Sequence, residues 1–460
     1  MWCEEEIAHK IHTDRRMIML QEITRATAAK IKNPVFRDYA NMYLNIYDNF
    51  VEQVEQFGLP FHKDQDHMKE TEEIRAQLAE MNVLNRCEGA SLVYNRISPA
   101  CEACKKGVGT MTSYVSFRCH RHCFFCFNPN QDNYEANCVQ KADWEQDLMN
   151  VKAEGGQLTH VALTGGEPLL HPEDCVAFFV KSRELFPLAH TRLYTSGDLL
   201  TEEMLQRLKD AGLDEIRFSY KIEDSAELKE KVLTNMTLAK NYITSVMVEM
   251  PVMPDAEEEM QGLLTRLDEM GIFGINLLEL CFPYNNVEAF KVRGYELKYP
   301  PYRTLYNFWY AGGLPVAGSE LVALRLMRFA AEKKMKLGIH YCSLENKNFG
   351  QMYQQNKVLS KSPATMYFSP KDFYLKCVKA FGADAVQVRR ILEKAGVRTF
   401  TYDKENEFIL FHPQYARLLK GRNMELALSI NVMEPRGGDI VARELKLLRA
   451  LPGDCDPEKI

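Results

Sequence analysis

Apolar residues are arranged in two alternating patterns between about residue 111 and residue 280. Short runs rich in β-branched and aromatic residues predict strands near residues 112–117, 159–163, 191–195, 214–219, 244–250 and 274–280. Between them, stretches such as residues 201–211 and 255–270 have the apolar spacing that is typical of helices. Alternation of this kind predicts an α/β fold with a parallel sheet and helices outside it. We expect a partial (β/α)6 barrel of the TIM type, open on one side.

The segments on either side of this region have a different character. Residues 1–110 predict an N-terminal helical region, with amphipathic runs at 4–30 and 68–81, that ends in a loop carrying a Cys-x2-Cys pair. Residues 111–343 contain the predicted barrel and a proline-rich extension that lines its pocket. Residues 344–460 predict a small C-terminal α+β domain.

Three cysteines stand close together just after the first predicted strand. Cys119, Cys123 and Cys126 have the spacing Cys-x3-Cys-x2-Cys. Three thiolates can bind three irons of a [4Fe–4S] cluster, which leaves the fourth iron open to another ligand. The loop joins a predicted strand to a predicted helix, so it lies at the carboxyl end of the strand, where barrel enzymes build their sites.

A second motif follows the next predicted strand. Gly165, Gly166 and Glu167 belong to the run Gly-Gly-Glu-Pro. Glycines let the backbone approach a ligand closely, and a carboxylate suits a charged amino group. Turns use the same residues for backbone reasons alone. Because this run comes one strand–helix unit after the cysteine loop, it indicates a ligand site.

With these two motifs, the chain resembles the radical S-adenosylmethionine (SAM) enzymes over roughly residues 112–280. Two further strand ends, residues 193–197 and 213–219, match the family as well. The resemblance implies that SAM chelates the open iron. One electron from the reduced cluster then cleaves SAM to methionine and a 5′-deoxyadenosyl radical, which abstracts a hydrogen from the substrate. The cofactor carries the difficult chemistry, and the protein supplies orientation and excludes side reactions.

The resemblance also implies roles for individual residues. They are Cys119, Cys123 and Cys126 for the cluster, Phe125 for the adenine side, Gly165, Gly166 and Glu167 for the SAM amino group, and Ser196 and Ser219 for the ribose or carboxylate. No residue is assigned as the final hydrogen donor, so the catalytic residue stays unknown.

A zinc ribbon is the alternative for the cysteines. Cys101 and Cys104 form another Cys-x2-Cys pair, separated from Cys123 and Cys126 by residues 105–122. Two such pairs are typical of a four-thiolate zinc site, which would make the chain a non-catalytic, metal-stabilised binding protein. A ribbon, however, has no use for Cys119 or for the Gly-Gly-Glu run.

Cys101 and Cys104 need another explanation if the ribbon is set aside. Cys87 precedes them, and Cys342 ends an apolar stretch that predicts a further strand. Our hypothesis is an auxiliary iron–sulfur cluster bound by Cys87, Cys101, Cys104 and Cys342. A structural zinc on the same thiols and free cysteines are the alternatives.

The substrate is less constrained than the mechanism. Residues 194–201 and 212–219 resemble the branch of the family with auxiliary clusters, which modifies peptides, proteins and cofactor precursors. The run from Cys126 to Pro129 resembles instead the activating enzymes of glycyl-radical proteins. We expect peptide or protein modification first, small-molecule rearrangement or oxidation next, and glycyl-radical activation third. A reductant protein such as a flavodoxin or ferredoxin is the expected electron donor.

Composition agrees with this class of enzyme. The chain has 460 residues, and 46% of them are apolar. Its thirteen cysteines are an odd number, and the closely spaced pairs suit metal binding rather than a disulfide framework. The first residues lack the pattern of a signal peptide, and no apolar run approaches the ~18–20 residues of a membrane span, so we expect a cytoplasmic protein. A net charge of −6 without a basic run gives no support for a nucleic-acid partner.

Overall fold

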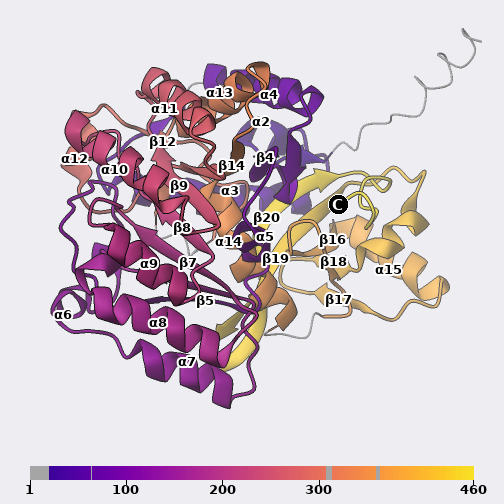
Figure 1. Ribbon diagram of the computed structural model, residues 1–460. Coiled ribbons are helices and arrows are strands. Elements are labelled where there is room, and N and C mark those ends of the chain that lie inside the picture. Colours follow the sequence, from indigo (N-terminus) through magenta and orange to yellow (C-terminus); the bar gives the residue numbers. More distant parts are fainter. Residues whose placement is uncertain (1–19, 64, 307–312, 359–362) are drawn as a thin grey trace, which may run out of the picture. The chain divides into compact units, whose positions relative to one another are not determined.

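The computed structural model describes residues 20–63, 65–306, 313–358 and 363–460. The chain divides into two compact units (Figure 1). The larger unit contains residues 54–303 and 307–351, and the smaller unit contains residues 1–53, 304–306 and 352–460. The predicted N-terminal region is therefore divided near residue 53 between the two units. Most of the predicted run at residues 4–30 lies outside the described residues.

A nine-stranded sheet forms the centre of the larger unit. Six adjacent parallel strands, starting from one edge, follow the order of the sequence: β5 (Thr110–Tyr114), β6 (His160–Thr164), β7 (His190–Thr195), β8 (Glu215–Phe218), β9 (Ser245–Val252) and β10 (Gly274–Glu279). All six strands expected from the apolar runs are present, and the α/β class is confirmed.

Three more strands extend this sheet beyond β10. β14 (Gly338–Cys342) pairs with β10 as a further parallel strand, in the stretch where the sequence predicted one. β4 (Ser91–Tyr94) then pairs with β14 in the antiparallel direction, and β3 (Leu84–Arg86) pairs with β4. The sheet thus takes its last two strands from residues that precede the first parallel strand in the sequence.

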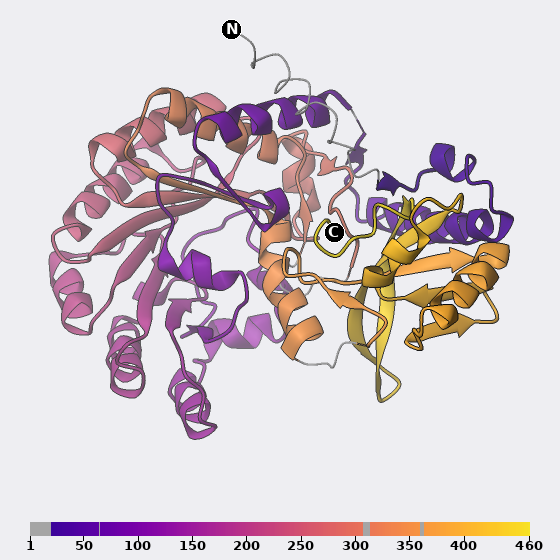
Figure 2. The same cartoon turned by 90° about the vertical axis from the view of Figure 1, so that its right-hand side faces the viewer.

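Helices connect the parallel strands. They are α7 (Trp144–Ala153), α8 (Pro172–Leu185), α9 (Glu202–Asp210), α10 (Ala226–Ala239), α11 (Glu257–Glu269) and α13 (Ser319–Glu332). Figure 2 shows these helices along the outer side of the curved sheet. Local chemistry fixes where several begin: Thr201, for example, caps α9 by accepting a hydrogen bond from the backbone of Met204, as N-cap residues do. No helix among the described residues is long and apolar enough to cross a bilayer.

The smaller unit is built on a seven-stranded sheet. Its strands are β1 (Gln21–Glu22), β15 (Tyr367–Phe368), β16 (Leu375–Phe381), β17 (Phe400–Asp403), β18 (Phe408–Phe411), β19 (Leu426–Arg436) and β20 (Asp439–Ala450). Side chains of β16 alternate between two cores. Val378 packs with Val388 of α15 (Gly382–Lys394), whereas Phe381 stacks on Phe36 of α3 (Pro34–Glu55) with ring centroids 4.6 Å apart. The predicted C-terminal domain therefore takes one of its layers from the N-terminal segment.

Candidate active site

A cavity of about 560 Å³ lies at the carboxyl ends of strands β5 to β9. Parallel strands place their carboxyl ends along one edge, which is where open α/β sheets bind ligands. The cavity is lined by all nine residues predicted for the cluster and for SAM: Cys119, Cys123, Phe125, Cys126, Gly165, Gly166, Glu167, Ser196 and Ser219. The structure thus brings together residues that span one hundred positions of the sequence (219 − 119).

The three thiols of the cysteine loop face a positively charged side chain. Cys119 is exposed, whereas Cys123 and Cys126 are half-buried. Burial raises the pKa of all three thiols, and the ammonium group of Lys221 acts in the opposite direction on each of them. A nearby cation favours the thiolate, which is the form that binds metals.

Ion pairs anchor this loop to the ends of two further strands. Arg121 pairs with Asp224, which follows β8, and lies 3.5 Å from Asp198, which follows β7. His120 Nε2 lies 2.9 Å from Asp198 Oδ2. The position of the cysteines is therefore set by the strand ends around them as well as by the loop itself.

The two glycines are required by the approach of one backbone segment to another. A Cβ on Gly166 would lie 2.1 Å from the carbonyl oxygen of Arg118. Gly165 has a φ of +106°, and its Cβ would lie 2.7 Å from the carbonyl oxygen of Ser116. Gly166 N donates a hydrogen bond to that same oxygen of Ser116 at 3.0 Å. The glycines therefore let the start of the cysteine loop lie against the end of β6.

A methyl group at Gly166 should displace the cysteine loop. We expect Gly166→Ala to lower stability by about 1–3 kcal/mol, the usual cost of overpacking, and to weaken SAM binding because the loop carries the thiols. Equilibrium dialysis with SAM and urea unfolding measure the two effects. Gly262→Ala is the matched control, because a Cβ there meets nothing within 4 Å inside α11, and alanine should stabilise that helix by roughly 0.5–1 kcal/mol. Unchanged SAM binding in Gly166→Ala would contradict the close approach of Gly166 to the backbone of Arg118.

The Glu167 carboxylate is 2% exposed and connects two strand ends. One oxygen accepts hydrogen bonds from the hydroxyl of Thr195 at 2.8 Å and from the backbone N–H of Leu169 at 3.1 Å. The other accepts from the backbone and hydroxyl of Ser196 at 2.7 and 2.6 Å. A carboxylate has about four lone-pair sites; three of the hydrogen bonds here tie the end of β6 to the end of β7, and the bond from Leu169 is local. Its contact with the SAM amino group stays a prediction.

Several residues that line the cavity were missed by the sequence interpretation. Lys221 follows Ser219 by two positions, and its place just beyond a strand end was the available signal. Glu249 stands in an apolar run that forms β9, and a lone carboxylate in a central strand is unusual enough to mark it. Tyr194 offered no comparable signal, because an aromatic residue in a strand is common.

Comparison with known proteins identifies the family. The sequence profile of the Radical SAM superfamily matches residues 113–267. A protein of Methanocaldococcus jannaschii, provisionally named a glycyl-radical enzyme activating enzyme, is 30% identical over 337 residues, which cover 69% of this chain and 84% of the relative. The chain belongs to the radical SAM superfamily.

Solved structures give more distant matches. Streptococcus suis SuiB bound to the precursor peptide SuiA has a TM-score of 0.37 at 13% identity, over 66% of this chain and 62% of that chain. A polyhistidine-tagged form of anSMEcpe with bound AdoMet has a TM-score of 0.31 at 18% identity, over 38% of this chain and 50% of that chain. The matched region spans less than two thirds of either protein, and these similarities are too low to assign a site or a substrate.

As a radical SAM enzyme, the protein uses a [4Fe–4S] cluster and SAM, and the donors around the cavity fit both. Three thiols beside Lys221 suit an anionic cluster. Within the part of the chain that is described, no three His, Cys, Asp or Glu side chains converge on a point as ligands of a single ion.

A buried charged network adjoins this cavity in the radical SAM unit. Arg217 of β8 is 2% exposed, and its guanidinium contacts Glu215 Oε1 at 2.6 Å and Glu249 Oε2 at 2.5 Å. It also donates to the hydroxyl of Tyr194 at 3.2 Å and lies 3.3 Å from the sulfur of Cys101. Because Tyr194 and Glu249 line the cavity, this network forms part of its wall.

The other four predicted cysteine ligands lie outside the lining of this cavity. Cys101 and Cys104 lie on the short helix α5 (Pro99–Cys104), Cys87 lies in the turn between β3 and β4, and Cys342 is the last residue of β14.

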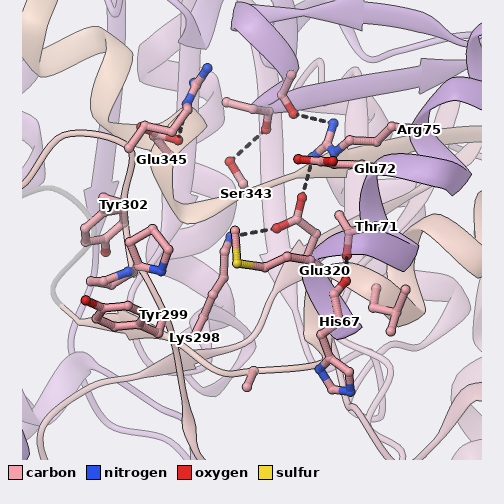
Figure 3. Close-up of a pocket in the computed structure, with 18 of the residues that line it drawn as sticks. His67, Thr71, Glu72, Arg75, Lys298, Tyr299, Tyr302, Glu320, Ser343 and Glu345 are labelled. Carbon is pink, nitrogen blue, oxygen red and sulfur yellow. Dashed lines mark hydrogen bonds and ion pairs between the residues drawn. The ribbon is translucent and has the colours of Figure 1, made fainter. Parts of the chain in front are cut away.

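A second cavity of about 440 Å³ lies near the carboxyl ends of β10 and β14 (Figure 3). An ion network forms one wall of it. Lys298 Nζ lies 2.7 Å from both Glu320 Oε2 and Glu279 Oε1, and Arg75 Nη2 lies 2.5 Å from Glu320 Oε1. Burial raises the pKa of Glu279, whereas Lys298 and Arg75 outweigh burial and lower the pKa of Glu320 to about 2.

Removing the shared cation of this network should destabilise the fold. Lys298→Met leaves the buried carboxylate of Glu279 without its ammonium partner, and losing one member of a buried pair costs about 3–5 kcal/mol. The loss should shrink as the pH falls, because Glu279 can then bind a proton and remove the buried charge. Urea unfolding at several pH values measures this. Lys291→Met is the control, since its pair with Glu288 is exposed and surface pairs contribute about 0–1 kcal/mol. Equal losses of stability in Lys298→Met and Lys291→Met would contradict the assignment of Lys298 to a buried ion network.

Proposed function

We propose that Cys119, Cys123 and Cys126 bind the [4Fe–4S] cluster, and that SAM occupies the cavity of about 560 Å³ beside them. The lining supports this proposal, because the three thiols share the cavity with the Gly-Gly-Glu run and with Ser196 and Ser219, which follow two further strands. When bound, the two cofactors supply a 5′-deoxyadenosyl radical that abstracts hydrogen from a substrate. The residues of the chain position the thiols, because Arg121 and His120 anchor the cysteine loop to Asp224 and Asp198.

The parallel sheet of the larger unit supports the finer fold assignment. We propose a partial (β/α)6 barrel, extended by β14, because the strands follow one another in sequence order and the helices lie along one side (Figure 2). A barrel of this kind places all strand ends around one mouth.

We propose that the substrate is a protein, and that hydrogen is taken from a backbone glycine of a glycyl-radical enzyme. The observation that carries this is the 30% identity to a relative provisionally named as an activating enzyme, of which the chain covers 84%. The third cysteine is followed by the Phe-Asn-Pro run that resembles such enzymes. In the structure, Asn128 of that run donates to the carbonyl oxygen of Gly165 at 2.7 Å, which connects the cysteine loop to the glycine motif.

Deuterium transfer tests this proposal. The anaerobic enzyme, SAM and dithionite are incubated with a glycyl-radical protein from the same genome, produced with deuterated glycine. We expect deuterium in the 5′-deoxyadenosine formed, and an organic radical signal on the partner in EPR. The same partner with alanine at its radical glycine is the control and should give neither.

Other outcomes separate the competing substrates. Deuterium transfer to 5′-deoxyadenosine with a lasting mass change in the partner, and no stable radical, would favour peptide modification over activation. Cleavage of SAM that depends on a small molecule and ignores the partner protein would contradict a protein substrate.

We further propose that a flavodoxin or ferredoxin supplies the electron in the cytoplasm. The reason is chemical, since an open iron–sulfur cluster needs a low-potential donor and a reducing compartment. Replacing dithionite by purified flavodoxin with its reductase should sustain 5′-deoxyadenosine formation if this is correct.

A further inference from the structure

Four cysteines that the SAM cavity does not use come from three separate segments of the larger unit. Cys87, Cys101 and Cys342 are buried, and Cys104 is half-buried. The thiols influence one another: Cys104 raises the pKa of Cys87, Cys101 raises that of Cys104, and both raise that of Cys342. These are additions to the larger effect of burial, which raises the pKa of Cys342 to about 12. Geometry places two of them close together: Cys101 Sγ lies 3.3 Å from Asn276 Nδ2 of β10, and Leu278, two residues further along β10, lies opposite Cys342 of β14.

The pairing of strands brings Cys342 next to the segment that carries Cys87. Cys342 lies opposite Ser91 in the antiparallel pair of β14 and β4. One residue further along, the backbone N–H of Ser343 donates to the carbonyl oxygen of Ala90 at 3.1 Å. Ala90 N in turn donates to the carbonyl oxygen of Cys87 at 3.0 Å. Residues 255 positions apart in the sequence (342 − 87) are therefore joined by one strand pair and one turn.

Cys87 is held in a strained turn. Cys87, Glu88 and Gly89 have φ angles of 52°, 53° and 90°, and a non-glycine residue in this left-handed region costs of the order of 1–3 kcal/mol. Two guanidinium groups hold the carbonyl groups of the turn: Arg75 donates to Gly89 at 2.9 Å, and Arg303 donates to Glu88 at 2.5 Å and to Cys87 at 3.4 Å. Strain that persists under such restraint is typical of functional positions.

Nitrogen donors are directed at two of the sulfurs. Cys101 Sγ accepts from Arg217 Nη2 and from Asn276 Nδ2, both at 3.3 Å. Cys342 Sγ accepts from Asn346 Nδ2 at 3.2 Å. A neutral thiol is a weak acceptor, whereas a metal-bound thiolate is a good one, and N–H bonds to cluster sulfurs tune the potential of the cluster. A coordinating metal deprotonates its thiols outright, which offsets the cost of burying them.

We infer that Cys87, Cys101, Cys104 and Cys342 bind a second [4Fe–4S] cluster within the larger unit. A cluster suits the site because thiolates are its ligands and N–H bonds to its sulfurs tune it, and Arg217, Asn276 and Asn346 place such donors against two of these sulfurs. The second cluster would be one side chain from the SAM cavity, since Arg217 contacts both Cys101 and the cavity-lining Tyr194 and Glu249.

Metal and sulfide counts on the anaerobically reconstituted full chain test this inference without any substrate, so the result does not depend on which substrate the enzyme takes. We expect about eight irons and eight sulfides for two clusters. Cys101→Ala/Cys104→Ala should retain about four irons and four sulfides. The EPR signal of its reduced cluster should still shift when SAM is added. Cys119→Ala/Cys123→Ala/Cys126→Ala should also retain about four of each but show no SAM shift.

A matched control removes two other buried thiols. Cys175→Ala/Cys377→Ala takes thiols that are 0% and 1% exposed and should keep the full iron content. The SAM shift in Cys101→Ala/Cys104→Ala shows that this variant is folded. If that variant does not fold, Cys87→Ala replaces it. Cys87 is the ligand in the strained turn, and its loss should give the same iron count. Iron content equal to that of the unaltered chain in these variants would overturn the inference. So would the loss of about one zinc instead of about four irons.

Discussion

Alanine at Cys119, Cys123 and Cys126 together should abolish reductive cleavage of SAM and leave the larger unit folded. The chemistry requires thiolates that hold three irons of the cluster. The fold does not require them, because Cys119 is exposed and the other two thiols are half-buried. The loop also keeps its anchors, since Arg121 still pairs with Asp224 and His120 with Asp198. Formation of 5′-deoxyadenosine with dithionite as reductant measures activity, and thermal unfolding measures stability.

Cys138 provides the control for this loss, because it is a half-buried thiol that raises the pKa of Cys126 and so lies near it. If the fourth iron is open to SAM, Cys138 is not a ligand, and Cys138→Ala should keep both the cluster and the cleavage of SAM. Loss of cluster iron in Cys138→Ala would mean that the site is closed by a fourth thiolate. Retained cleavage in the triple variant would show that the cluster lies elsewhere.

The sequence predicted the parts of the site that depend on local order. Cys119 follows β5, Gly165 follows β6, Ser196 follows β7 and Ser219 follows β8. Parallel strands that alternate with helices bring their carboxyl ends to one edge. Knowing the order of the elements was therefore enough to bring these residues together, and no long-range contact had to be guessed.

Other features depend on contacts that the sequence does not specify. The amphipathic pattern of α3 indicates that one face is buried, but it does not say that Phe36 stacks on Phe381 in a sheet more than three hundred residues away. Glu167 was predicted to bind a ligand. In the structure its carboxylate accepts hydrogen bonds from two hydroxyl groups at the end of the next strand, those of Thr195 and Ser196. In each case the residue type indicates that the side chain needs a packing or hydrogen-bonding partner, but the identity of that partner depends on the three-dimensional fold.

Replacing Arg217 by methionine should cause the largest loss of stability. The guanidinium contacts two carboxylates, Glu215, which is 0% exposed, and Glu249. Removing one member of a buried ion pair costs about 3–5 kcal/mol, so leaving two carboxylates behind should cost at least about 5 kcal/mol at neutral pH. Methionine keeps most of the volume and removes only the charge and the donors. The urea-unfolding transition of the larger unit measures the effect.

The pH dependence of this loss has a definite sign. Burial would raise the pKa of Glu215, but Arg217, with hydrogen bonds from His190 and Ser98, lowers it to about 2. Stability from a lowered carboxyl pKa is present above the ordinary value of 4.5 and disappears as the pH falls toward about 2. The difference in the free energy of unfolding between Arg217→Met and the unaltered chain should therefore be largest at neutral pH and decrease in acid. Arg266→Met is the control, because its pair with Glu230 is exposed, and it should cost about 0–1 kcal/mol at any pH.

The carboxylates themselves provide the decisive comparison. A buried ion pair replaced as a whole by neutral groups is often tolerated, whereas a pair broken by removing one partner is not. Adding Glu215→Gln and Glu249→Gln to Arg217→Met should therefore recover much of the stability that Arg217→Met loses alone. The recovered protein should still cleave SAM poorly, because Glu249 and Tyr194 line the cavity and Arg217 orients both. If Arg217→Met/Glu215→Gln/Glu249→Gln recovered no stability, Arg217 would act through packing rather than through its charge.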